Sequence, residues 1–240
     1  MTKTRAIVLH SLKYGEKKLI VDVFTKDEGR LTFLTSIPQS NKSKIKKQFF
    51  IPLTILDIEF TLHRNRQFQH FDEIAIVSSP SMLQANQSKL AISFFIAEFL
   101  YHATKGEQAP NSTLFIYIEE SLRWLEAASD NFANFHLVFM MRFTRFIGFF
   151  PNVEQYHDGD FFDLRDGVFV SLPPLHRDVL LPNEASLILS FMRMNYANMG
   201  RYQLSHVERN RIIDIVLSYY RLHVPGFPEL KSLDILRSLF

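Results

Sequence analysis

Short apolar and β-branched runs, separated by polar turns, fill the first 78 residues and predict a sheet. The run KLIVDVFT is followed by KDEG and then RLTFLTS, so Gly29 can take the positive φ of a hairpin turn. Pro52 lies inside a longer run and predicts a bulge or an edge position. The five predicted strands cover residues 6–12, 18–25, 30–36, 49–62 and 68–78. No helix intervenes that could cover a parallel sheet, so we expect a small antiparallel barrel, the five-stranded OB-fold.

After Pro80 the apolar residues recur at spacings of three and four, which is typical of helices. Ser205 and Glu208 have the arrangement of a capping box and predict the start of a late helix. The predicted helices cover residues 90–101, 114–128, 132–147, 184–196, 205–224 and 229–240. Residues 148–178, rich in Gly, Pro and Asp, predict an irregular insert. The sequence therefore predicts an α+β protein, with an OB-fold barrel over residues 1–79 and a mainly α-helical domain over residues 80–240.

The composition narrows the class of protein. Hydrophobic residues make up 47% of the chain and charged residues 22%, so it can bury a core. There is no cysteine, which excludes disulfides and any zinc or iron–sulfur site with Cys ligands, and fits a reducing cytosol. The N-terminus lacks the apolar region of a signal peptide, and the longest apolar stretches contain Glu98, Arg142 and Arg145. We therefore expect a cytoplasmic protein without a membrane span.

The net charge of +2 is unevenly distributed along the chain, and the N-terminal part is basic. Residues 1–50 hold 11 Lys and Arg against four Asp and Glu, a net charge of +7. Four lysines are concentrated in the segment NKSKIKK: Lys42, Lys44, Lys46 and Lys47. Arg30, Arg64 and Arg66 lie at predicted strand ends or turns. A barrel with a basic rim is a common platform for single strands, so we predict that these seven residues contact nucleic acid. A solubilising loop is the alternative interpretation of the lysines.

A second cluster is acidic. The stretch YHDGDFFDLRD offers His157, Asp158, Asp160, Asp163 and Asp166. Such side chains can bind a divalent metal, so the alternative from another class is a metal-dependent phosphohydrolase using the His157–Asp163 region. Turns also require Asp and Gly, and no companion cluster is present. The chain has no P-loop, G-x-S-x-G or G-x-G-x-x-G motif, so we expect a protein that is not an enzyme and needs no cofactor.

A helical stripe of phenylalanines is predicted to form core. Its members are Phe132, Phe135, Phe139, Phe143 and Phe146. Arg142 lies close to this stripe on a helical wheel, and Arg145 lies further round. An apolar groove with a basic edge would suit the acidic, aromatic tail of a partner protein, so both arginines are candidates for partner binding.

The order of these features resembles the RecO family of bacterial recombination and repair mediators. The opening AIVLHSLKYGEKKLIVDVFTKDEGRLTFLTS is similar to the start of that family, and KGEQAPNSTLFIYIEESLRWL to its pair of helices around an acidic, proline-containing loop. RFIGFFPN matches its helix that ends in a Gly-aromatic pair. YYRLHVPGFPELKSLDIL resembles its closing segment, with Lys231 and Ser232 in the Lys-Ser step.

The sequence departs from the family pattern in two places. Many members bind zinc through cysteines after the Gly-aromatic helix, whereas the insert here has none, so we predict no structural zinc and packing by Phe161, Phe162, Phe169 and Val170 instead. Elemental analysis after dialysis checks this. The family also tends to carry Lys and Arg directly after the second hairpin strand. Here those places read SIPQS, and the charge is displaced to NKSKIKK.

The resemblance implies a function for the whole chain. It implies binding of single- and double-stranded DNA, strand annealing, and help in loading a recombinase onto coated single strands. The implied partners are RecR and the acidic C-terminal tail of single-strand-binding protein. A third interpretation is an interaction scaffold whose basic face meets an acidic protein. It predicts no DNA binding even at low salt.

Overall fold

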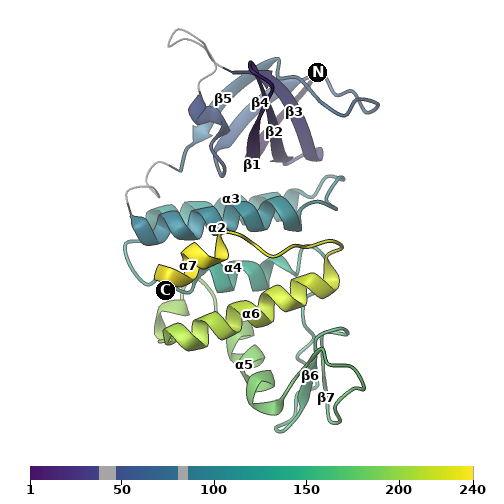
Figure 1. Ribbon diagram of the computed structural model, residues 1–240, viewed down its shortest axis with the longest axis vertical. Coiled ribbons are helices and arrows are strands. Elements are labelled where there is room, and N and C mark those ends of the chain that lie inside the picture. Colours follow the sequence, from purple (N-terminus) through teal and green to yellow (C-terminus); the bar gives the residue numbers. More distant parts are fainter. Residues whose placement is uncertain (38–46, 81–85, 240) are drawn as a thin grey trace. The chain divides into compact units, whose positions relative to one another are not determined.

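The computed structural model describes residues 1–37, 47–80 and 86–239 (Figure 1). The chain divides into two compact units. The first unit contains residues 1–127 and 230–239, and the second contains residues 128–229. The predicted domain boundary at residues 79 and 80 falls inside the first unit, and the domain limits stay a prediction.

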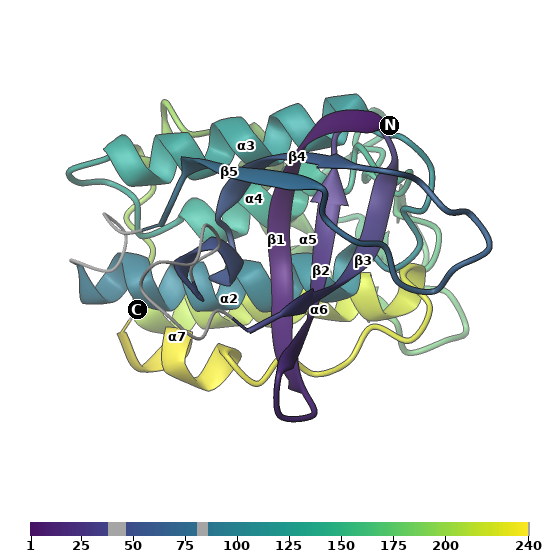
Figure 2. The same cartoon turned by 90° about the horizontal axis from the view of Figure 1, so that it is seen from above.

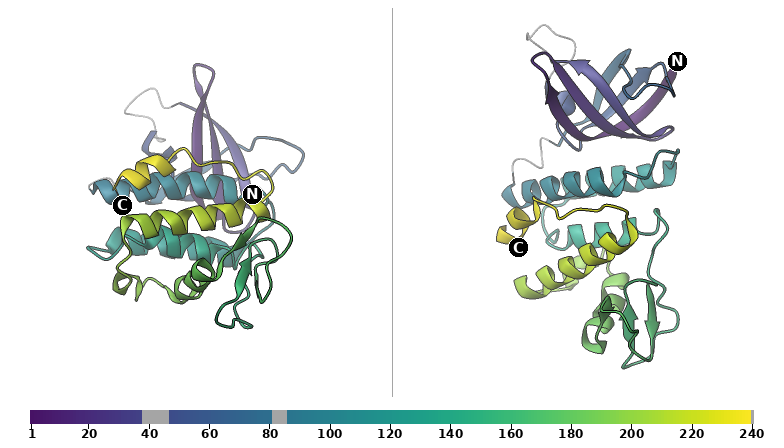
Figure 3. Two further views of the ribbon diagram at one scale, coloured as in Figure 1. Left: turned by 60° about the horizontal axis from the view of Figure 1, so that its bottom comes forward. Right: turned by 45° about the vertical axis from the view of Figure 1, so that its right-hand side comes forward.

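The first unit contains a five-stranded antiparallel sheet. Its strands are β1 Thr2–Tyr14, β2 Lys18–Thr25, β3 Gly29–Ser36, β4 Ile55–Phe60 and β5 Glu73–Ser78, in the order β3-β2-β1-β4-β5. The predicted hairpin is confirmed, with Gly29 at φ 70°. Gln69 joins the two edges: its backbone NH donates to the Thr32 carbonyl and its own carbonyl accepts from Leu34, both at 2.9 Å. This parallel bridge closes the sheet into an OB-fold-like barrel, whose curvature the right panel of Figure 3 shows.

Both faces of this sheet are buried. Inward-facing residues form a core that includes Val8, Val23 and Phe33, each fully buried. Ile7 and Phe24 alternate with them and are also fully buried, because helices cover the outer face. These helices are α2, Gln87–Ala103, and α3, Ser112–Ala127, which lie beneath the strands in Figure 2. The ring of Phe24 stacks on Phe115 of α3 with centroids 6.3 Å apart.

The strand predicted over residues 49–62 is wrong in its first part. Residues Lys47–Phe50 form a short 3-10 helix, η1, and β4 begins only at Ile55. Phe50 is 2% exposed and joins the barrel core, which an extended strand would prevent. Leu53 has a φ of 70°, rare for a residue with a side chain, and its NH donates to the Val8 carbonyl at 2.7 Å. Burial of Phe50 and this turn therefore override the local strand pattern.

The end of the chain returns to the first unit. Helix α7, Leu233–Leu239, packs against α2 and confirms the docked terminal helix. Glu98 of α2 accepts hydrogen bonds from the backbone NH groups of Lys231, at 3.0 Å, and Ser232, at 2.8 Å. The Lys-Ser step is therefore the point at which the returning chain is fixed to α2.

The second unit is mainly helical. Its helices are α4 Phe135–Phe143, α5 Pro182–Arg193, the short 3-10 helix η2 Met199–Arg201, and α6 His206–His223. The capping box of Ser205 and Glu208 at the start of α6 is confirmed. Helix α4 is shorter than the predicted 132–147, because Thr144 ends it and turns follow. Within the phenylalanine stripe, Phe135, Phe139 and Phe143 are fully buried, and the two outer members are half-buried.

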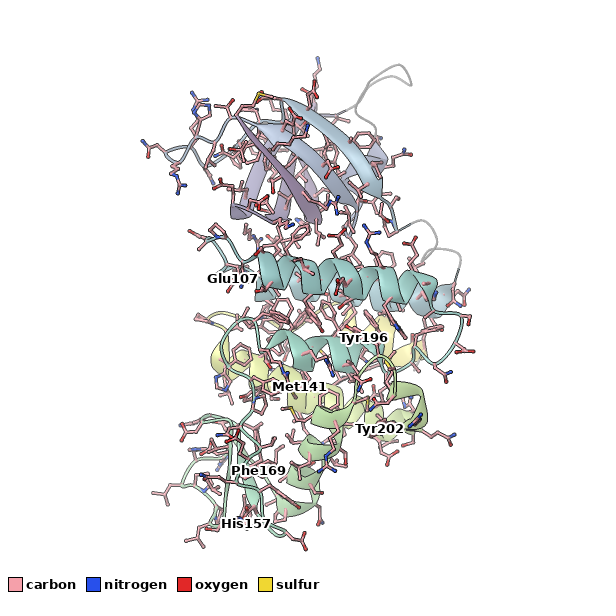
Figure 4. The ribbon with its side chains drawn as sticks, turned by 180° about the vertical axis from the view of Figure 1, so that it is seen from behind. Glu107, Met141, His157, Phe169, Tyr196 and Tyr202 are labelled. Atoms are coloured by element: carbon pink, nitrogen blue, oxygen red, sulfur yellow. The ribbon has the colours of Figure 1, made fainter. Side chains whose placement is uncertain are left out.

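Three short strands form a small sheet, two of them within the predicted insert and the third just after it. They are β6 Phe161–Asp163, β7 Val168–Val170 and β8 Val179–Leu180, in the order β7-β6-β8. Phe162 and Phe169 (the latter labelled in Figure 4) pack in a cluster with Tyr219 of α6, as predicted. Phe161 and Val170 are only half-buried. Two of the four predicted anchors therefore lie in this core.

Candidate nucleic-acid interface

The structure brings three of the predicted DNA-contacting residues together. Arg30, Arg64 and Arg66 all line one cleft of the first unit, with a volume of about 580 Å³. The lysine prediction lies mostly outside the described residues, which do not include Lys42, Lys44 and Lys46. Lys47 is described and is exposed at the start of η1.

Three segments that are distant in sequence form the walls of the cleft. One wall is the start of β3, residues 30–32, and the second is the β4–β5 loop, residues 62–69. The third is residues 108–110 of the loop between α2 and α3. This loop also carries Glu107, which Figure 4 labels. In an OB-fold the strand 2–3 face and the loop between strands 4 and 5 are common binding surfaces, so the cleft lies where this barrel type recognises ligands.

Gln69 holds the β4–β5 loop in shape. Its side-chain oxygen accepts from the backbone NH of His63 at 2.9 Å, and its side-chain nitrogen donates to the carbonyls of His63, at 2.9 Å, and Arg66, at 3.3 Å. Gln69 is 3% exposed. A buried amide with these partners fixes the turn that displays Arg64 and Arg66.

Arg30 differs from the other two arginines. Its side chain is 12% exposed, lies 3.9 Å from Asp22, and donates to the Tyr101 carbonyl at 2.5 Å. Burial lowers the pKa of its guanidinium, and the negative charge of Asp22 opposes that change. The guanidinium also lies 4.6 Å from the centroid of the Tyr101 ring. Arg30 therefore stiffens the wall of the cleft through partners within the chain.

Arg64 and Arg66 are the cations that the cleft presents to solvent. The side chain of Arg64 is 83% exposed, and its one ion-pair partner among the described residues is Glu28, at 3.8 Å. A pair this exposed contributes little energy, so a phosphate can displace it. Arg66 is also exposed, and in the described part of the chain no carboxylate or carbonyl holds its guanidinium.

The sequence interpretation missed a second basic surface, the β1–β2 hairpin. Lys13, Tyr14, Lys17 and Lys18 are exposed at its tip, and the Tyr14 side chain is 53% exposed. The Ile37 backbone NH donates to the Lys17 carbonyl at 2.8 Å, so Ile37 lies beside this tip. An aromatic ring between lysines at a Gly turn, as in KYGEKK, was the signal that could have found it.

The carboxylates of the acidic cluster stabilise turns in the second unit. Asp160 accepts from the His157 backbone NH at 2.7 Å. Asp163 accepts from the Arg165 backbone NH at 2.8 Å, and its other oxygen lies 3.2 Å from the His176 ring. Among residues 1–37, 47–80 and 86–239, no group of three or more His, Asp or Glu is placed to hold a metal ion. The predicted metal chemistry of this cluster therefore gains no support from its geometry.

The two arginines predicted to bind a partner lie at the end of α4 and just beyond it. Arg145 is exposed, and its guanidinium lies 3.9 Å from the centroid of the Phe150 ring. Arg142 is half-buried, and its Nε has no hydrogen-bond partner among the residues described. Their role in partner binding stays a prediction.

Over the same described residues, no helix is both long and apolar enough to cross a bilayer.

Comparisons with known proteins cover the whole chain. The family model described as Recombination protein O N terminal matches residues 1–80, and that described as Recombination protein O C terminal matches residues 85–234. The DNA repair protein RecO of Phocaeicola vulgatus is 45% identical over 240 residues, which cover 100% of this chain and 99% of the relative. The protein of the same name from Bacteroides fragilis is 42% identical, with 100% and 99% covered. That from Flavobacterium psychrophilum is 34% identical, with 99% and 98% covered. These matches describe a DNA repair protein, and the chain belongs to the RecO family of DNA repair proteins.

Proposed function

We propose that this protein is a recombination mediator that binds single- and double-stranded DNA through its OB-fold-like barrel, anneals strands, and helps load a recombinase onto coated single strands. The observation that carries this proposal is the cleft at which Arg64 and Arg66 stand exposed on a braced loop, in a family of DNA repair proteins. Their guanidinium groups have the geometry to pair with phosphate oxygens.

Two basic surfaces of one barrel support contact with a strand of several nucleotides. The β4–β5 loop offers Arg64 and Arg66, and the β1–β2 hairpin offers three lysines beside Tyr14. Phosphate contacts position a strand without reading its sequence, as annealing of arbitrary sequences requires. Neutralised phosphates also repel a second strand less, which favours pairing.

The proposed protein partners are RecR and the acidic C-terminal tail of single-strand-binding protein. For the tail, the support is the family resemblance together with Arg142 in the last turn of α4 and Arg145 against the Phe150 ring. No feature of the phosphohydrolase alternative offers comparable support.

A salt titration of DNA binding tests the proposal. Fluorescence anisotropy of a labelled single strand is measured at several salt concentrations for the wild type and for Arg64→Ala/Arg66→Ala. If each arginine neutralises one phosphate, the slope of log K against log salt should fall by about 1.4, at about 0.7 per phosphate. Arg193→Ala/Arg201→Ala removes the same charge from exposed positions of the second unit and is the matched control. Absence of DNA binding at low salt would favour the scaffold interpretation. An unchanged slope in the first variant would remove the cleft from the interface.

A further inference from the structure

Two of the three walls of the cleft are joined through backbone atoms. The Arg30 backbone NH donates to the Glu107 carbonyl at 2.8 Å, which ties β3 to the α2–α3 loop. A Cβ added to Gly29 would lie 2.5 Å from the Ala109 carbonyl oxygen and 2.8 Å from that of Glu107. The hairpin turn and the loop therefore touch through main-chain atoms, and glycine is required at this contact. The spacing of these two walls is therefore set by main-chain atoms.

The lining of the cleft suits the parts of a nucleotide. Leu31, Leu62 and Pro110 offer apolar surface against which the face of a base can lie. Gln67 and Gln108 present amide groups, which can donate to and accept from the edge of a base. Both are exposed, and in the described part of the chain no partner holds either side-chain amide.

The glutamines contrast with Gln69 in this respect. The Gln69 amide is fully engaged by His63 and Arg66, so it shapes the loop and has no free group for a ligand. The cleft thus has two amides available for recognition, with Arg64 and Arg66 beside them for the phosphates. Its volume of about 580 Å³ falls within the range of small-molecule sites, about 300–1,000 Å³.

We propose that the cleft holds one unstacked nucleotide of a DNA single strand, with its base between the β4–β5 loop and the joined walls of β3 and the α2–α3 loop, and with its phosphates on Arg64 and Arg66. This inference rests on the proposed DNA-binding function and adds a site that selects single strands. In a duplex each base is stacked and its edge is paired, so it can enter such a cleft only by leaving the helix. A single strand loses far less by unstacking one base. The barrel therefore prefers single strands at this cleft, and duplexes bind through phosphate contacts alone.

The test uses the full chain with Gln67→Ala/Gln108→Ala, which removes both available amides from exposed positions. Gln155→Ala/Gln203→Ala changes two exposed glutamines of the second unit and is the matched control. The probes are a single strand with one internal 2-aminopurine, the corresponding duplex, and free deoxyadenosine monophosphate. For the wild type and the control we expect 2-aminopurine fluorescence to rise on binding of the single strand, because the base leaves the stack. For the cleft variant we expect this rise to disappear and single-strand affinity to fall about tenfold, with duplex affinity unchanged.

Three results would overturn the inference. One is a cleft variant that binds the single strand as the wild type does and still brightens 2-aminopurine. The second is an equal loss of affinity for single strand and duplex, which would place the glutamines on a general phosphate surface. The third is binding of the free mononucleotide as tightly as the strand, which would make the cleft a site for a soluble nucleotide. In each of these cases, loss of DNA binding by Arg64→Ala/Arg66→Ala would still support the proposed function. Failure of the wild-type protein to bind any DNA would refute that function itself.

Discussion

The hydrogen bonds of Glu98 predict how firmly the returning end of the chain is held. Its carboxylate accepts from the backbone NH groups of Lys231, at 3.0 Å, and Ser232, at 2.8 Å, and from the Ser232 hydroxyl at 2.5 Å. Burial acts to raise the pKa of this carboxyl group. The hydrogen bonds favour the ionised form more strongly, so its pKa lies below its usual value. Replacement by glutamine or alanine should therefore weaken the attachment of α7.

The size of the effect follows from the number and type of bonds lost. Hydrogen bonds to charged groups contribute about 1.5–3 kcal/mol each, and neutral ones about 0.5–1.5 kcal/mol. Glu98 is only partly buried, so solvent screening weakens these hydrogen bonds. We therefore expect energies at the lower end of these ranges. We expect Glu98→Gln to lower the free energy of unfolding by about 1 kcal/mol. Glu98→Ala should lower it by about 2 kcal/mol, because two backbone NH groups then lose their acceptor.

The effect should depend on pH in a defined direction. The pKa of Glu98 is lower in the folded state than in the unfolded chain. Its stabilising contribution is therefore complete above the unfolded value of about 4.3, and it is lost as the pH falls through the lower folded value. The wild type and Glu98→Gln should differ in stability at neutral pH and converge in acid.

Urea unfolding followed by circular dichroism measures the global effect, and trypsin cleavage after Lys231 and Arg237 measures local opening. Glu120→Gln, at an exposed position of α3, removes the same charge and is the control. Our reasoning fails if Glu98→Gln and wild type unfold at the same urea concentration at neutral pH and release the C-terminal segment to trypsin at the same rate.

Three further predictions concern the barrel. The first variant replaces the predicted lysines with alanine: Lys42, Lys44, Lys46 and Lys47. If all four contact phosphate, the salt slope for single strands should fall by roughly 3 units with a stability change under about 0.5 kcal/mol, and an unchanged slope would identify a merely solvated segment. Tyr14→Ala should weaken single-strand binding by about 1–3 kcal/mol through lost stacking, measured by anisotropy, and equal affinities would contradict a stacking role. Gly29→Ala should lower the free energy of unfolding in urea by about 1–3 kcal/mol, because its Cβ would meet the Ala109 carbonyl at a φ of 70°, and wild-type stability would show that the loop yields.

Local signals in the sequence predicted local structure well. Gly29 after KDE defined the hairpin, and Ser205 with Glu208 defined the start of α6. These features depend on residues within one turn of each other, so a short pattern contains all the interacting groups. Residues 49–53 were predicted wrongly because their conformation depends on Phe50 entering the barrel core and on Leu53 bonding to Val8. Both partners are distant in sequence, and periodicity carries no signal of them.

The candidate site was predictable in residue type but not in assembly. A count of basic residues selected Arg30, Arg64 and Arg66, and the structure places all three in one cleft. The count of basic residues did not separate Arg30, which contacts Asp22 and Tyr101, from the two exposed arginines. The third wall, with Gln108, is an uncharged part of a helical connection and carried no signal of binding. It joins the cleft through the close main-chain contact at Gly29, which only a folded chain defines.

The division of the first unit between two stretches of chain affects its biogenesis. Residues 1–127 leave the ribosome first, then the entire second unit, and only afterwards residues 230–239. Since domains fold as they emerge, the barrel and α2 exist for the time taken to synthesise about a hundred residues, at roughly 5–20 residues per second, with the α7 face of α2 uncovered. During that interval Glu98 lacks the backbone NH donors of Lys231 and Ser232. A chain that terminates early would therefore keep this face of α2 exposed.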